Sequence, residues 1–430
     1  MDYIRTIRQV NFAKLWSAQI LSQVAQYLLN FALIILVYDL TAGSKFGSFS
    51  VSLVVLSFSI PSILFAPAAG TYVDYWDRKK VLFYANLTRT VLALLYIVSL
   101  DNLFVILLLT FLTSTVTQFF VPAEASTIPK VVDKKHLLTA NSLFVFTLYT
   151  SFVVGYSASG PVVKLLGQEG PFIATALMFG LATILAAWLP PQPREKTAEK
   201  LPRPQVLSQI KHNWEIIRSN KDRYYAVMQM AVTQGMVFIL ITLAPALSLA
   251  LLKVPLTEAS HFIVVPVGLG MISGVILINY LSKRLSKLTV IQACLIAGSF
   301  TLIMIGLTGQ LYRTVNGDPL ATTGGITIII AVLMFILGVV NSMVSASAQT
   351  LVQETTSDEN RGKVFGSLNM IVNIAATIPV FVVGLLADLI SVTKVLVVLG
   401  VLLLVYAILL FWRYGFFARV VNKIQRPTKI

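Results

Sequence analysis

Amide side chains recur along one apolar stretch of the sequence, residues 13–39. Gln19, Gln23, Gln26 and Asn30 follow at spacings of four, three and four residues, which places them on one face of a helix. Amides donate and accept hydrogen bonds without carrying a charge. Polar groups in so apolar a segment are costly unless they face water or each other. The face therefore either lines a ligand-binding cavity or bonds to neighbouring helices, and both interpretations stay open.

Other apolar stretches carry isolated polar side chains that are candidates for the same two roles. Asn341 and Ser345 share one helical face, and Asn373 shares another with Thr377. The full set of these further candidates is Gln118, Gln234, Asn341, Ser345 and Asn373.

Charged side chains are almost excluded from the apolar stretches. Arg89 is the basic exception, and we expect it to be either a ligand-binding group or a structural partner. The carboxylates nearest to the stretches are Asp39, Glu124 and Asp388, and the first two are candidates for binding a proton. Since no proton relay is evident, we expect a mostly neutral, apolar cavity. Such a cavity favours lipophilic or amphiphilic substrates over sugars, anions or metals.

The elements that position these residues are membrane-spanning helices. Of the 430 residues, 57% are hydrophobic and 12% charged, against about 25% charged residues in soluble proteins. Apolar runs of roughly 20 residues recur, and they do not alternate as β-barrel strands do. We predict an all-α membrane protein with twelve spans, near 13–39, 46–73, 80–100, 103–122, 138–165, 171–189, 224–252, 258–281, 288–309, 323–352, 362–388 and 394–415.

A polar break divides the chain into two halves of six spans. Residues 190–223 are rich in proline and charge, which is typical of a solvated linker. Within it, residues 205–219 have apolar side chains at helical spacing, which predicts an amphipathic helix on the membrane surface or, alternatively, a plain linker. We predict bundles at 1–189 and 224–430, joined by the linker 190–223.

Basic residues predict the orientation of the chain. The net charge is +15, and 27 of the 33 Lys and Arg fall in the tails and in the loops on the side of the termini. The positive-inside rule then places both termini in the cytoplasm. The basic excess is therefore attributed to topology and lipid headgroups rather than to nucleic acid. The single cysteine, Cys294, lies in an apolar run and forms no internal disulfide.

The loop after the second span carries a motif. Gly70, Asp74 and the pair Lys79–Lys80 match the pattern G-x-x-x-D-R-x-G-R-R/K. This loop resembles the signature loop of the major facilitator superfamily, although Tyr75 replaces its first arginine. The stretches 11–41, 122–143 and 358–369 are similar to the drug:proton antiporter branch with macrolide-efflux-type proteins. The resemblance implies an inner gate made by Gly70, Asp74, Asp77, Arg78, Lys79, Lys80 and Arg361.

The resemblance also implies two pseudo-symmetric six-helix bundles around a central cavity lined by spans 1, 4, 7 and 10. Gly160 and Pro161 in the fifth span are similar to the antiporter motif of that helix. The family resemblance further implies a monomeric, multi-pass transporter of the cell (inner) membrane, without cofactor, that is not an enzyme. The resemblance also implies proton-coupled efflux by alternating access, with Asp39 and Glu124 as the coupling candidates. The alternatives are a lipid or lysolipid translocator on the same fold and a non-transporting membrane scaffold or sensor.

Overall fold

The computed structural model describes residues 2–41, 44–73, 75–133, 136–191, 211, 214–281, 285–314, 319–356 and 358–413. These residues form helices and no β-strand. Helices follow from the sequence because hydrocarbon offers no partner for backbone N–H and C=O groups, and a helix pairs them internally. Within the described ranges, twelve helices are long and apolar enough to cross a membrane, which confirms the predicted fold class.

A short helix, α1 (Asp2–Ile7), precedes the first bundle. The six long helices that follow are α2 (Val10–Leu40), α3 (Gly47–Val73), α4 (Arg78–Ile97), α5 (Leu103–Val131), α6 (Leu137–Leu166) and α7 (Gly170–Ala187). The second bundle begins with α9 (Lys221–Leu247), which continues as the π-helix η2 (Ser248–Leu252). It goes on with α10 (Leu256–Ala259), η3 (Ser260–Val264), α11 (Val265–Leu281), α12 (Lys287–Thr314), α13 (Pro319–Thr355), α14 (Asp358–Ile390) and α15 (Val392–Arg413).

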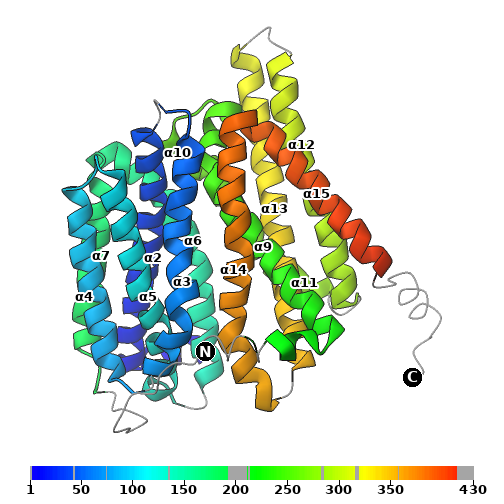
Figure 1. The fold of residues 1–430 in the computed structure, drawn as a ribbon. Coiled ribbons are helices and arrows are strands. Elements are labelled where there is room, and N and C mark those ends of the chain that lie inside the picture. Colours follow the sequence, from blue (N-terminus) through cyan, green and yellow to red (C-terminus); the bar gives the residue numbers. More distant parts are fainter. Residues whose placement is uncertain are drawn as a thin grey trace, which may run out of the picture.

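The helices pack as two groups that meet along α3 and α14 (Figure 1). In the first group α2 packs on α6 and α7, α3 on α5, and α4 on α5 and α7. In the second, α13 packs on α9, α11 and α12, while α15 packs on α12. The domain boundaries expected at 189 and 224 stay predictions.

Only the end of the predicted amphipathic helix at 205–219 lies within the described residues. Trp214–Arg218 forms a helical turn, and Ile217 is buried in the apolar core of the second bundle. The Trp214 ring meets the Tyr224 ring edge-on at 5.9 Å. This turn is therefore packed against α9.

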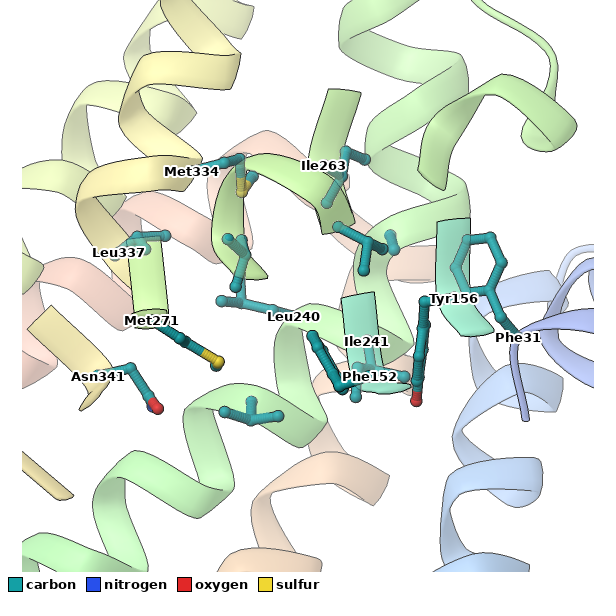
Figure 2. Close-up of a pocket in the computed structure, with 14 residues that line it drawn as sticks. Phe31, Phe152, Tyr156, Leu240, Ile241, Ile263, Met271, Met334, Leu337 and Asn341 are labelled. Atoms are coloured by element: carbon teal, nitrogen blue, oxygen red, sulfur yellow. The ribbon is translucent and has the colours of Figure 1, made fainter. Parts of the chain in front are cut away.

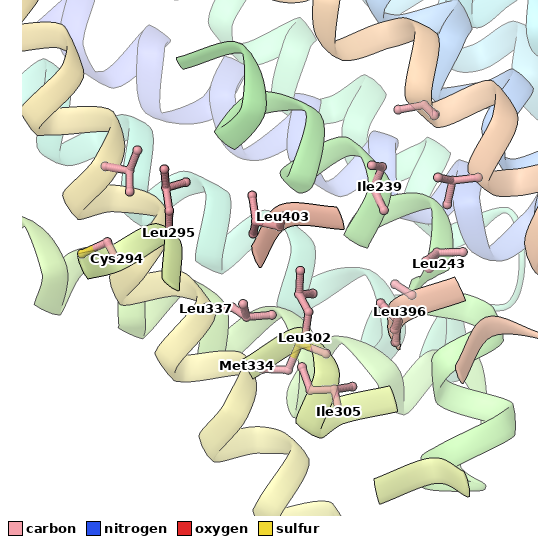
Figure 3. Packing of buried hydrophobic residues seen from close by; sticks show 14 of the residues in the cluster. Ile239, Leu243, Cys294, Leu295, Leu302, Ile305, Met334, Leu337, Leu396 and Leu403 are labelled. Atoms are coloured by element: carbon pink, nitrogen blue, oxygen red, sulfur yellow. The ribbon is translucent and has the colours of Figure 1, made fainter. Parts of the chain in front are cut away.

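Among the described residues, the buried apolar cluster that joins the bundles lies toward one end of the molecule. We call the end where α2 begins and α15 ends the terminal end, and the opposite one the far end. Phe31, Ile35, Val55 and Tyr156, from the far-end halves of α2, α3 and α6, join the large core cluster of the second bundle. Figure 3 shows part of that cluster. The cluster at the terminal end of the first bundle contains only residues of that bundle. The bundles are thus sealed at the far end.

Glycines set the closest helix pair within the second bundle, α11 and α13. A Cβ on Gly338 would overlap the Val267 carbonyl, and a Cβ on Gly270 would overlap the Phe335 carbonyl. Backbones approach this closely only where no side chain separates them, and in lipid such close packing drives helix association.

Gly338→Ala is therefore expected to destabilise the protein by about 1–3 kcal/mol, the usual cost of overpacking. The matched control is Gly180→Ala in α7, where a new Cβ has its nearest neighbour at 3.9 Å. The control should be neutral or slightly stabilising, because alanine favours helix. Buried Cys294 is a built-in reporter, since a thiol-reactive dye labels it on thermal unfolding. Equal unfolding midpoints for the two variants would contradict the close approach.

Candidate functional site

A pocket of about 540 Å³, which includes space open to its surroundings, lies between the bundles near the middle of α9 and α13 (Figure 2). The first bundle contributes Phe31 from α2 and Phe152 and Tyr156 from α6. The second contributes side chains of α9, η3, α11 and α13, listed as Val237, Leu240, Ile241, Ala244, Ile263, Val264, Val267, Met271, Met334, Leu337 and Asn341. None of these described lining residues is charged. The pocket can therefore hold a lipophilic molecule but offers no ion-pair partner.

One wall of the pocket is formed by Phe31, Phe152 and Tyr156, which belong to a cluster of four aromatic rings with Tyr27 behind them. Tyr27 and Phe31 stand one turn apart on α2, and Phe152 and Tyr156 stand one turn apart on α6. Ring centroids are 4.7 Å apart for Phe152–Tyr156 and 5.4 Å for both Phe31–Tyr156 and Tyr27–Phe152. The sequence reasoning missed this wall. The spacing of four residues within each pair was visible, but the match between the two helices was not.

Asn341 is the one predicted cavity residue that lines the pocket. Its side-chain amide donates a hydrogen bond to the Thr233 carbonyl on α9, at 3.1 Å. Ser345, one turn further along α13, donates to the Thr233 hydroxyl at 3.3 Å. Asn341 also borders a second, intrabundle cavity of about 440 Å³ between α9, α12, α13 and α15. The predicted polar face of α13 thus holds α9 while its first residue borders both spaces.

The amide face of α2 is engaged in bonds between and along helices. Gln19 is buried and donates to the Phe144 carbonyl of α6 at 3.4 Å. The Gln26 amide donates to the Asn30 side chain at 2.8 Å and accepts from Thr117 of α5 at 3.3 Å. Gln23, between them, is half-buried.

The remaining predicted cavity residues also lie outside the pocket lining. Gln118 donates to the Ser114 carbonyl of its own helix at 3.1 Å. Gln234 and Asn373 are half-buried, and the Asn373 carbonyl accepts from the Thr377 hydroxyl at 2.6 Å.

Arg89 lies in the interior of the first bundle rather than in the pocket. Its guanidinium is sandwiched between the rings of Phe120 at 4.2 Å and Phe179 at 4.6 Å, from α5 and α7. It donates to the Asn86 side chain at 2.6 Å, and Asn86 also accepts from Ser22 of α2 at 3.0 Å. Cation–π contacts are strongest when desolvated, as here. Arg89 thus joins α2, α4, α5 and α7.

Glu124 supplies the opposite charge to this centre. The sequence reasoning put it at the end of the fourth span, but α5 continues to Val131 and Glu124 is only 6% exposed. It attracts Arg89 electrostatically without forming a direct ion pair among the described residues. Its Oε1 has no hydrogen-bond partner among them either. A buried carboxylate with an unused oxygen can accept a proton. Asp39, the other coupling candidate, is exposed at the end of α2.

The predicted gate loop is described in part. Asp77 caps α4, and its carboxylate accepts from the backbone N–H groups of Lys79 at 2.9 Å and Lys80 at 3.4 Å. Arg78 is buried at the first position of α4. A Cβ built on Gly70 would meet no described atom of a neighbouring helix within 4 Å, so Gly70 makes no close helix contact in this conformation. Asp74 and the side chain of Arg361 lie outside the described residues.

The fifth-helix motif lies at the far end of the bundle interface. A Cβ on Gly160 would overlap the backbone of Thr257 in α10. Pro161 lies within the continuous helix α6. The Gly–Pro pair therefore marks a close approach between the two bundles.

Comparisons with known proteins agree with this architecture. The family model of the Major Facilitator Superfamily matches residues 15–317 and 319–428. The chain is 24% identical to the MFS-type transporter YfiS of Bacillus subtilis (strain 168), over 83% of each chain. It is 22% identical to macrolide efflux protein A of Streptococcus pyogenes, over 93% of this chain and 95% of that protein.

Solved structures share the fold at low identity. The nucleoside transporter NupG superposes with a TM-score of 0.70 and 14% identity, over 93% of this chain and 99% of that one. The POT family transporter PepTSo gives a TM-score of 0.69 and 12% identity, over 97% and 99%.

Removing Arg89 is expected to be far more damaging than removing an exposed arginine. Arg89→Leu leaves Glu124 buried without a countercharge, which typically costs about 3–5 kcal/mol. The double variant Arg89→Leu/Glu124→Gln should lose less free energy of unfolding than the sum of the losses of the two single variants. We expect a difference of at least about 1 kcal/mol, because the two residues interact. Arg218→Leu, on the exposed side of the linker turn, should stay within about 0.5 kcal/mol. Thermal midpoints of the purified variants measure this, and strict additivity would refute the pairing.

Proposed function

Because the chain belongs to the major facilitator superfamily, we propose that it exports lipophilic or amphiphilic small molecules by alternating access, driven by proton antiport. The chain is a multi-pass membrane protein with the family and fold of transporters. Macrolide efflux protein A, by its name, exports a drug class, and this relative supports the export direction. The proposal extends to the cell (inner) membrane, both termini in the cytoplasm and a monomeric working unit.

The single observation that carries the substrate class is the lining of the pocket between the bundles. Aromatic rings and the side chains of Met271 and Met334 surround the space, and Asn341 supplies its only side-chain amide. Methionine adapts its shape to varied apolar partners. Nucleosides, which NupG transports by its name, present many polar groups that such a lining leaves unpaired. An apolar or amphiphilic substrate avoids that cost.

Proton coupling is assigned to Glu124, with Arg89 as its fixed countercharge. Protonation removes the attraction between the two groups, which lie on α5 and α4. A change in that attraction biases the packing of the first bundle, so proton binding and conformation become linked. Asp39 stays a second candidate, since it is accessible at the far end.

The inner gate is assigned to the loop after α3. In the opposite conformation, Asp74 would bond to a helix N-terminus of the second bundle, with Arg78 and Lys79 beside it. Gly70, Asp77, Lys80 and Arg361 complete this proposed gate, which would close the terminal end while the far end opens.

Filling the pocket should abolish export. Ile241→Trp adds a bulky ring to the lining, whereas Ile173→Trp places the same ring on the exposed surface of α7. Pump-deficient cells expressing the wild-type chain or Ile173→Trp should accumulate less of a lipophilic dye and drug panel than cells with Ile241→Trp. Adding a protonophore, which collapses the proton gradient, should erase this difference in accumulation.

Unchanged accumulation across the panel, with each protein confirmed in the membrane, would overturn drug export. Flux of a fluorescent lysolipid in liposomes would then favour the lipid translocator.

Neutralising Glu124 should uncouple transport from protons. In liposomes, a pH gradient should stimulate dye transport by Glu124→Gln at least tenfold less than it stimulates transport by the wild-type protein. Downhill dye flux without a gradient should continue. Asp101→Asn changes an exposed carboxylate in the loop between α4 and α5 and should leave the stimulation intact. A Glu124→Gln protein that still responds fully to the gradient would exclude Glu124 as the coupling group.

A further inference from the structure

Asp388 joins the two bundles at the far end. Its carboxylate accepts hydrogen bonds from the backbone N–H groups of Ser48 at 3.0 Å and Phe49 at 2.9 Å. These are the second and third residues of α3, whose first N–H groups have no partner within the helix. The N-terminus of a helix also attracts negative charge. A carboxylate at the end of α14 thus caps a helix of the opposite bundle.

The helices approach closely one turn before Asp388. A Cβ on Gly384 would lie 2.8 Å from the Ser52 Cβ and 3.0 Å from the Ser48 carbonyl oxygen. Beside this contact, the Phe49 and Phe381 rings meet edge-on with centroids 5.2 Å apart. The cap therefore sits on a tight backbone contact between α3 and α14.

The same construction recurs on the other side of the bundle interface. Gly160 of α6 lies against the backbone of Thr257, and Lys164 forms an ion pair with the adjacent Glu258 at 3.6 Å. The Lys164 and Glu258 side chains are 70% and 41% exposed, so water screens this pair. Asp388, in contrast, bonds directly to two backbone donors.

The two contacts are counterparts in the duplicated fold. Helices α6 and α14 are each the fifth long helix of their bundle, and each ends in Gly-x-x-x-charge: Gly160 with Lys164, Gly384 with Asp388. In both, the glycine allows the close approach and the charge one turn later binds the start of the second helix of the other bundle. Sequence reasoning noted Gly160 but not its counterpart.

We propose that these two Gly-x-x-x-charge segments are paired latches that hold the far end closed, and that Asp388 is the dominant one. Opening the far end breaks the cap and exposes the first N–H groups of α3. The latch acts on the equilibrium between the two conformations, whatever the substrate or coupling ion. It therefore goes beyond the transport function proposed above.

Spin-label distances test the latch without any substrate. In a Cys294→Ser background, nitroxide pairs at Leu165 and Leu249 report the far end, and pairs at Tyr84 and Leu285 report the terminal end; all four side chains are exposed. Asp388→Asn loses the charge and keeps one acceptor oxygen for two donors. We expect it to raise the ratio of far-end-open to far-end-closed protein at least tenfold, with the terminal-end distance shortening.

A second variant keeps the proposal falsifiable if Asp388→Asn folds poorly. Gly384→Ala forces α3 and α14 apart and should shift the distances in the same direction. Asp101→Asn and Gly180→Ala are the matched controls and should leave both distributions unchanged. Lys164→Ala should shift the ratio less than Asp388→Asn.

Distance distributions identical to wild type in both Asp388→Asn and Gly384→Ala, with the proteins folded, would overturn the latch. So would equal shifts in the controls. A wild-type chain that exports no tested compound but whose Asp388→Asn variant opens still supports the latch. Conversely, proton-driven export with unshifted distances keeps the function and rejects the latch.

Discussion

A polar group inside this chain has almost no water to bond to, and the other features of the structure follow from that constraint. The buried hydroxyls of Thr110 and Thr147 donate to carbonyls one turn back in their own helices, both within 2.8 Å. Ser114 and Ser159 donate to carbonyls of the neighbouring helices α3 and α2. Such bonds avoid the cost of an unpaired group in hydrocarbon. The polar side chains named here therefore serve mainly to hydrogen-bond within and between helices.

The same constraint explains how well the fold could be predicted. Hydrophobic length alone located all twelve spans, because only a helix of that length crosses a bilayer without unpaired backbone. It failed at the end of the fourth span, which was predicted at residue 122. The helix continues to Val131, and one face of this segment is buried at Ala123, Glu124 and Thr127, so the Glu124 carboxylate faces protein rather than lipid.

The site was less predictable because it depends on which helix faces lie together. A single sequence shows that Gln19 and Gln26 share a face, but not whether water or another helix covers it. Arg89 and Glu124 are 35 residues apart on different helices, and nothing local indicates that they meet. The aromatic wall has the same character: its rings are ordinary apolar residues until α2 and α6 bring them together. Of the polar residues predicted from the sequence to line the cavity, only Asn341 lines the pocket.

The sealed far end and the pocket share residues, and this sharing links ligand binding to conformation. Phe31 and Tyr156 line the pocket and also belong to the apolar cluster that joins the bundles. A ligand that displaces either ring therefore weakens the seal next to it. Interfaces of packed side chains switch between discrete arrangements rather than deform continuously. A few polar contacts at the rim then suffice to set the balance, because the apolar cluster has no directional bonds that choose one arrangement.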